Sequence, residues 1–133
     1  MGKGSDYERK LTKTLDDAGW GVVRSGGSGS ATKNDRPDLI AGDGERVWVI
    51  EAKYSSDPII YLSPGEVEQI VSLAESLRAE AVVAPRWHSR KVEGVEADWY
   101  PVSPHVLPRT ASDNLSVKAH EVVDRAHPLS FYL

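Results

Sequence analysis

The fold of this chain is decided by the stretch PDLIAGDGERVWVIEAK, residues 37–53. It holds a short strand pattern at Asp38–Ala41 and a longer one at Arg46–Tyr54. The intervening Gly42-Asp43-Gly44-Glu45 is typical of a hairpin turn. Since Val47–Ile50 is apolar at every position, the second strand is expected to be central and covered on both faces.

Charged residues follow this apolar run directly. Because side chains alternate along a strand, Glu51 and Lys53 are expected on one face. Pairing around the turn brings Asp38 close to Glu51, so two carboxylates converge beside a lysine. The alternative is a turn aspartate next to solvent-exposed Glu51 and Lys53, but charges placed after four apolar residues favour a site.

This combination of side chains suits phosphodiester hydrolysis. Carboxylate oxygens are the ligands that Mg²⁺ prefers, and the metal ion can activate water and polarise a phosphate. Lys53 can orient the attacking water or stabilise charge that develops on the phosphoryl oxygens. The pattern therefore predicts a Mg²⁺-dependent nuclease.

On the N-terminal side, the pattern predicts a helix over about 6–18, a strand over 20–24 and a glycine-rich loop over 25–36. Ser5 is expected to be the N-cap of the helix. Glu8 stands at the capping-box position, so it can either complete that cap or serve the acidic cluster.

On the C-terminal side, Ser63-Pro64-Gly65-Glu66 predicts a helix start, and an apolar stripe continues to Leu77. A central strand is expected at 81–84 and an edge strand at 99–102, because Pro101 cannot donate to a central ladder. Residues 103–114 are expected to be a loop, and 115–125 a last helix.

This order of elements predicts an α/β fold with a mixed sheet of about five strands flanked by helices. The whole chain, 1–133, is expected to form one domain. Its core is expected over about 5–103, followed by a C-terminal loop and helix over about 104–133.

Composition narrows the function classes. The 16 Lys and Arg against 20 Asp and Glu give a net charge of −4, which alone argues mildly against nucleic-acid binding. Basic residues nevertheless crowd the first third of the chain and residues 86–91. The second cluster suits either nucleic acid or a polar loop whose Trp87 covers the core.

The chain has no cysteine, which excludes disulfides, thiolate metal sites and a cysteine nucleophile. No apolar run is long enough to span a bilayer, so no membrane association is expected. Together with the absence of cysteine, this predicts a cytoplasmic protein.

Several motifs of the chain resemble those of one nuclease family. They are KGSDYER at 3–9, VRSGGSGS at 23–30, PDLIAG at 37–42, EAK at 51–53 and IYL at 60–62. Pro37-Asp38 with Glu51-Ala52-Lys53 is similar to the PD-(D/E)xK nuclease superfamily. The combination, over roughly the first 100 residues, resembles the archaeal Holliday junction resolvases of the Hjc/Hje type.

The resemblance implies a restriction-endonuclease-like core and a homodimer that makes paired cuts in four-way DNA junctions. It implies Mg²⁺ as cofactor, with Mn²⁺ as a substitute. Metal ligands would be Glu8, Asp38, Glu51 and the carbonyl of Ala52, and Lys53 would be the catalytic lysine.

The resemblance also assigns residues to DNA. Arg9 and Arg24 would contact phosphates or support the acidic cluster. A serine of the glycine-rich loop would act in catalysis or DNA binding, and the repeated Gly-Ser leaves Ser28 and Ser30 as candidates. The basic residues of the same loop, Lys33 and Arg36, are further candidates for DNA contact.

The expected function is therefore a structure-selective endonuclease that resolves four-way junctions in DNA recombination and repair. One alternative is a restriction-type or repair endonuclease, which the short chain disfavours. Another is a DNA-binding module without activity, for which a broken site would be expected.

Overall fold

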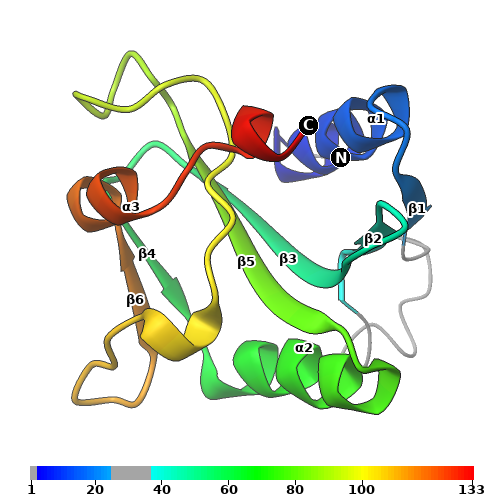
Figure 1. The fold of residues 1–133 in the computed structure, drawn as a ribbon. Helices are drawn as coiled ribbons and strands as arrows, with labels where there is room; N and C mark the ends of the chain where they lie inside the picture. Colours follow the sequence, from blue (N-terminus) through cyan, green and yellow to red (C-terminus); the bar gives the residue numbers. More distant parts are fainter. Residues whose placement is uncertain (1–2, 25–36) are drawn as a thin grey trace.

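The computed structural model describes residues 3–24 and 37–133 (Figure 1). Within these ranges four consecutive strands follow the first helix, and strands and helices alternate only after them. The elements are α1 (Lys3–Asp17), β1 (Gly21–Arg24), β2 (Leu39–Gly42), β3 (Val47–Ser55), β4 (Ile59–Leu62), α2 (Pro64–Leu77), β5 (Glu80–Trp87), the 3-10 turn η2 (Pro104–Val106), β6 (Leu115–Lys118), α3 (Ala119–Arg125) and the 3-10 turn η3 (Leu129–Tyr132).

The main sheet of the described residues has the strand order β1-β2-β3-β5. Strands β1, β2 and β3 are antiparallel neighbours, and β5 runs parallel to β3. The β2–β3 register ends at the pair Leu39 and Ile50, whereas β3 continues to pair with β5 up to Ser55. The second half of β3 therefore has a strand partner on one side only.

Helices α1 and α2 cover opposite faces of this sheet (Figure 1). Leu11 and Leu15 of α1 pack with Ile50 on one face. Val67 and Ile70 of α2 pack with Val49 on the other. Because Val49 faces α2, the alternation of β3 directs Glu51 and Lys53 toward α2 as well.

The hairpin and the second helix start form as expected. Gly44 has a φ of 98°, the left-handed conformation that the β2–β3 turn requires. Ser63 and Glu66 form both hydrogen bonds of a capping box at the start of α2. The expected cap at Ser5 is wrong, because α1 begins at Lys3. None of the helices in 3–24 and 37–133 is long and apolar enough to cross a membrane.

The C-terminal third departs most from expectation. Residues 115–118 were expected to be helical but form β6, and only Ala119–Arg125 is helix. Strand β6 pairs antiparallel with β4, a strand that was not expected, and together they make a second sheet. Leu115 and Val117 are buried through this pairing, which overrides the local helical pattern.

The expected central strand at 81–84 is an edge strand of the four-stranded sheet and extends over Glu80–Trp87. The expected edge strand at 99–102 is not formed. That segment runs beside β5 through one bridge, Val83 to Val102, and a hydrogen bond from Tyr100 N–H to the Pro85 carbonyl at 3.0 Å. Pro101 lacks the N–H that a continuous ladder needs.

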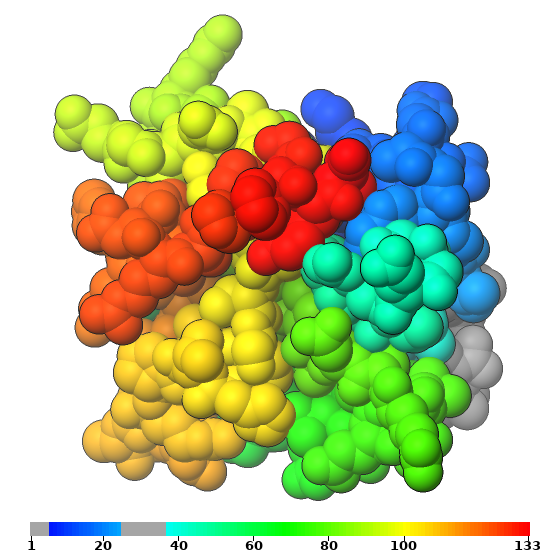
Figure 2. Space-filling view, in the orientation of Figure 1, coloured from blue at the N-terminus to red at the C-terminus, as the bar shows by residue number. Residues whose placement is uncertain are grey.

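The C-terminal turn closes the face of the sheet that α1 covers. Leu129 is buried in the same cluster as Leu11. The Tyr132 ring lies edge-on to Trp48 at 5.1 Å, and the Arg46 guanidinium lies over it at 5.5 Å. Figure 2 shows this end of the chain (red) against α1 (blue) and the hairpin (cyan).

The structure separates the two interpretations of residues 86–91. Trp87 is 1% exposed and belongs to the core, so it is not available for stacking on a base. Arg86 is also buried, with its guanidinium over the rings of Tyr7 and Trp99 at 5.0 and 4.4 Å. Arg90 and Lys91 remain exposed.

Truncation of Trp87 should therefore destabilise the fold rather than weaken a DNA contact. We expect Trp87→Ala to lower the free energy of unfolding by roughly 3–5 kcal/mol. Trp87→Phe should cost less, because the indole N–H finds no hydrogen-bond partner among the described residues. Urea unfolding of both variants checks this, and wild-type stability in Trp87→Ala would contradict it.

Candidate active site

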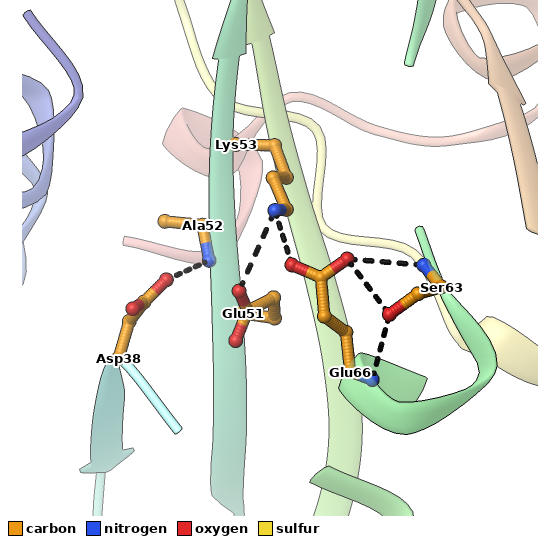
Figure 3. A network of polar contacts seen from close by, with 6 residues as sticks. All are labelled: Asp38, Glu51, Ala52, Lys53, Ser63 and Glu66. Atoms are coloured by element: carbon orange, nitrogen blue, oxygen red, sulfur yellow. Dashed lines mark hydrogen bonds and ion pairs between the residues drawn. The ribbon is translucent and has the colours of Figure 1, made fainter. Parts of the chain in front are cut away.

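Asp38 stands where β2 and β3 stop pairing. Its backbone N–H donates to the Ile50 carbonyl at 3.1 Å, and its Oδ2 accepts the Ala52 N–H at 2.9 Å. Beyond Ile50 this side of β3 has no partner from β2, so the carboxylate takes the place of a strand carbonyl. Figure 3 shows the Asp38 side chain turned toward Ala52 in this way.

Glu51 and Lys53 lie on the face of β3 that α2 covers. Glu51 is buried, with 9% of its surface exposed. The Lys53 ammonium lies 3.8 Å from Glu51 Oε2 and 2.5 Å from Glu66 Oε2 (Figure 3). The expected convergence of Asp38, Glu51 and Lys53 is therefore present, with Glu66 added to it.

Both carboxyl groups of the hairpin resist ionisation. Burial, together with the neighbouring Glu8, raises the pKa of Asp38 to about 6 against the opposing hydrogen bond from the Ala52 N–H. Burial also raises the pKa of Glu51 to about 8, with the charge of Asp38 adding to the effect. Lys53 lowers both values but does not offset the burial.

Lys53 and Glu66 have the opposite character. Burial lowers the pKa of Lys53, but the hydrogen bond to Glu66 and the surrounding carboxylates outweigh it, so the net pKa is raised. Burial raises the pKa of Glu66, and the Lys53 and Ser63 hydrogen bonds bring it below its ordinary value. Both groups are held in their charged forms near neutral pH.

Glu8 reaches this region from α1. Its Oε1 accepts a hydrogen bond from Arg24 Nε at 2.8 Å, and both side chains are partly buried. This ion pair joins α1 to β1, and both expected roles of Arg24, phosphate contact and support of the acidic cluster, stay predictions. Because α1 begins before Ser5, Glu8 does not hold the capping position that the sequence also allowed.

The other expected contacts are less well defined. Arg9 is exposed and pairs with Asp6 at 2.5 Å on the surface of α1. The four candidates from the glycine-rich loop lie outside the described residues, and they are Ser28, Ser30, Lys33 and Arg36. Their expected roles therefore stay predictions.

Glu66 is the residue whose part in the site was missed. Its position in the Ser63-Pro64-Gly65-Glu66 cap was correctly predicted, but its second oxygen binds Lys53. The sequence could have suggested this contact because Lys53 lies only a short way before the start of the helix. That short separation does not by itself show whether the first turn of the helix faces the lysine.

The donor set fits a hard cation such as Mg²⁺. Among the described residues, no three acidic or histidine side chains are grouped so that they could hold a metal ion by themselves. Mg²⁺ commonly takes one or two carboxylates from a protein and completes its shell with water and substrate phosphate. The partly buried Asp38 and the buried Glu51 supply two carboxylates whose repulsion a cation would relieve.

A pH-dependent stability follows from Glu51. An acid with a raised folded-state pKa loses its proton more readily in the unfolded chain, so its ionisation favours unfolding. Protonated Glu51 therefore contributes to the stability of the folded state. This contribution is fully present below about pH 4.5 and is lost as the pH rises toward about 8. In metal-free protein at pH 8, Glu51→Gln should therefore raise Tm by roughly 5 °C or more.

Thermal melts at pH 5 and pH 8 with a chelator check this expectation. The gain should shrink at pH 5, where wild-type Glu51 is largely protonated. Added Mg²⁺ should raise the Tm of the wild type at pH 8 more than that of Glu51→Gln. An equal difference at both pH values would show that the charge of Glu51 is not the cause.

Comparison with known proteins identifies the family of the chain. The family model described as "Archaeal holliday junction resolvase (hjc)" matches residues 1–129. A protein of Archaeoglobus fulgidus named "Crossover junction endodeoxyribonuclease Hjc" is 39% identical over 89 residues, which are 67% of this chain and 65% of that protein. A protein of the same name from Methanocaldococcus jannaschii is 33% identical over 86 residues, 65% of this chain and 60% of that protein.

Both alignments span slightly less than two thirds of the relatives' own length. A solved structure of Archaeoglobus fulgidus Hjc matches with a TM-score of 0.80 at 30% identity, over 98% of this chain and 95% of that one. The expected α/β nuclease fold is thereby confirmed, with four strands in the main sheet and a second, two-stranded sheet in place of about five. The chain belongs to the archaeal Holliday junction resolvase (Hjc) family.

Proposed function

We propose that this chain is a structure-selective endonuclease that resolves four-way DNA junctions by metal-dependent hydrolysis of phosphodiester bonds. The observation that carries the proposal is the pair of the partly buried Asp38 and the buried Glu51 beside the charged Lys53. Membership of the Hjc family adds the substrate, since the relatives are named crossover junction endodeoxyribonucleases.

Asp38 and Glu51 would hold the cation, with the Ala52 carbonyl as a further ligand. When bound, Mg²⁺ supplies a Lewis acid and lowers the pKa of water at the site. The Asp38 carboxylate is already oriented by the Ala52 N–H, so little reorganisation is needed on binding. Mn²⁺ has similar ligand preferences and is expected to substitute.

Lys53 would act on the scissile phosphate. Its ammonium is partly exposed and remains protonated, so it can donate to a phosphoryl oxygen as negative charge builds there. Glu8 would complete the acidic cluster, with Arg24 fixing its carboxylate. Arg9, Lys33, Arg36, Ser28 and Ser30 would contribute to DNA contact or catalysis.

Resolving a four-way junction requires one nick in each of two strands near the branch point, so two active sites are needed. We therefore propose a homodimer that recognises the backbone geometry of the junction more than its base sequence. With a role in recombination and repair, the protein would act on DNA in the cytoplasm. Gel filtration combined with light scattering tests the dimer directly.

The activity is tested by incubating the protein with end-labelled synthetic four-way junctions and Mg²⁺, with a chelator as control. Symmetric nicks near the branch point are expected. Cutting of linear duplex at fixed sequences would instead indicate a restriction-type enzyme. Tight binding without cutting in Mg²⁺ or Mn²⁺ would indicate a DNA-binding module.

Asp38→Asn should abolish cutting and preserve the fold. The asparagine oxygen can still accept the Ala52 N–H, but the negative charge toward the cation is lost. We expect the single-turnover rate to fall by at least roughly 10³-fold, with the junction Kd changed by less than about threefold.

Lys53→Ala should have a similar effect on the rate. The matched control for Asp38→Asn is Asp57→Asn. It removes a negative charge from an exposed turn after β3 and should leave the cleavage rate unchanged. Wild-type cutting by Asp38→Asn would refute the proposed cation site.

A further inference from the structure

Glu66 uses its two carboxylate oxygens for two different purposes. Oε1 accepts the backbone N–H of Ser63 at 3.0 Å and so closes the capping box of α2. Oε2 accepts a hydrogen bond from the Lys53 ammonium at 2.5 Å. One side chain therefore joins the first turn of a helix to the lysine of the proposed site (Figure 3).

This contact determines where the Lys53 ammonium lies. The distance from Nζ to Glu66 Oε2 is 2.5 Å, against 3.8 Å to Glu51 Oε2. A lysine side chain has several rotatable bonds and much rotamer entropy, so its head group is poorly fixed without a partner. Among the described residues, Glu66 is the closer of the two ion-pair partners of Lys53.

The anchor that Glu66 provides is rigid. Ser63 caps the helix with its own hydroxyl, which accepts the Glu66 N–H at 3.2 Å. The next residue, Val67, and Ile70 one turn further on are buried in the core between α2 and β3. The position of the carboxylate is thus set by the packing of the helix against the sheet that carries Lys53.

The capping box alone does not account for a charged residue at this position. Glutamine completes a capping box as glutamate does, since the bond to the N-cap N–H needs only an acceptor oxygen. The negative charge matters for the second contact, because an ion-paired hydrogen bond is stronger and more directional than a neutral one. The choice between the two residues therefore separates the cap from the lysine.

We propose that Glu66 is a positioning residue for catalysis: it holds the Lys53 ammonium at the edge of the site, ready to reach the scissile phosphate. The inference deepens the proposed nuclease function and rests on it. Glu66 itself is expected to contact neither DNA nor metal. Its effect passes through Lys53, so it should change the rate of cleavage and leave junction binding alone.

The variant that tests this is Glu66→Gln, which keeps the cap and removes the charge. We expect its single-turnover cleavage rate at saturating Mg²⁺ to fall roughly 10- to 100-fold, through lost orientation of Lys53. The junction Kd should stay within about twofold of the wild type, measured in Ca²⁺ so that binding is separated from cutting.

Two variants serve as matched controls. Ser63→Ala removes the hydroxyl that caps α2 and leaves the Glu66–Lys53 contact, so it should lower Tm but cut at near the wild-type rate at 25 °C. Glu68→Gln removes the same charge from an exposed position two residues further along α2 and should change neither rate nor Kd. A slow Ser63→Ala variant would mean that the cap, and not the charge, supports catalysis.

A second measurement does not depend on activity. A hydrogen-bonded lysine ammonium exchanges its protons slowly and can be observed by ¹H–¹⁵N NMR of the side chain, and Lys53→Arg identifies the signal. The Lys53 signal should persist in Ser63→Ala and be lost in Glu66→Gln. An unchanged signal in Glu66→Gln would overturn the inference whether or not the protein cuts DNA.

The outcomes of these experiments distinguish the positioning role of Glu66 from the proposed nuclease function on which it rests. If the wild type cuts no junction, the proposed function fails, while the NMR signal still reports on the Glu66–Lys53 contact. If the wild type cuts and Glu66→Gln cuts at the same rate, the positioning role alone is refuted. Faster cutting by Glu66→Gln would also refute it, since the carboxylate would then be restraining the lysine.

Discussion

The site depends on one hydrogen bond, from the Ala52 N–H to the Asp38 carboxylate. It lies where β2 stops pairing with β3, so the unpaired edge of a central strand is satisfied by a side chain. A backbone donor left unpaired here would carry a cost in free energy, and the carboxylate removes it. The same bond fixes Asp38 beside Glu51, so completing the sheet and assembling the acidic pair are one event.

The acidic pair has an electrostatic consequence for the rest of the fold. Two carboxyl groups with raised pKa values, Glu51 buried and Asp38 partly buried, destabilise the folded chain near neutral pH, and a cation would reverse this effect. Two ion pairs limit the electrostatic repulsion around this acidic pair. Arg24 neutralises Glu8 toward α1, and Lys53 is neutralised by Glu66 toward α2.

The elements that could be predicted from the sequence are those whose formation depends on residues close together in the chain. The β2–β3 hairpin and the capped start of α2 are set by turn and capping residues within a few positions. Strands β4 and β6 were missed because each is short and each depends on a partner far away in the chain. In 115–118 that pairing overrides the helical pattern, which continues as the helix α3 from Ala119.

The candidate site divides in the same way. Asp38, Glu51 and Lys53 could be placed together from strand alternation and hairpin register alone. The Glu66 contact could not, because it depends on the direction in which α2 leaves β4 and packs on β3. The buried positions of Arg86 and Trp87 were likewise hidden, since a cluster of cations around an aromatic is equally typical of a surface.

Arg86 makes a charged contact that depends less on salt than the ion pairs of the molecule. Its guanidinium is held against the rings of Tyr7 and Trp99, and no described carboxylate lies within ion-pair distance of it. Tyr7 in turn stacks on Tyr54 at the end of β3. Attraction to a ring face in a buried place is screened little by dissolved ions. The attachment of α1 to the sheet should therefore persist at ionic strengths that separate exposed ion pairs such as Arg9 with Asp6.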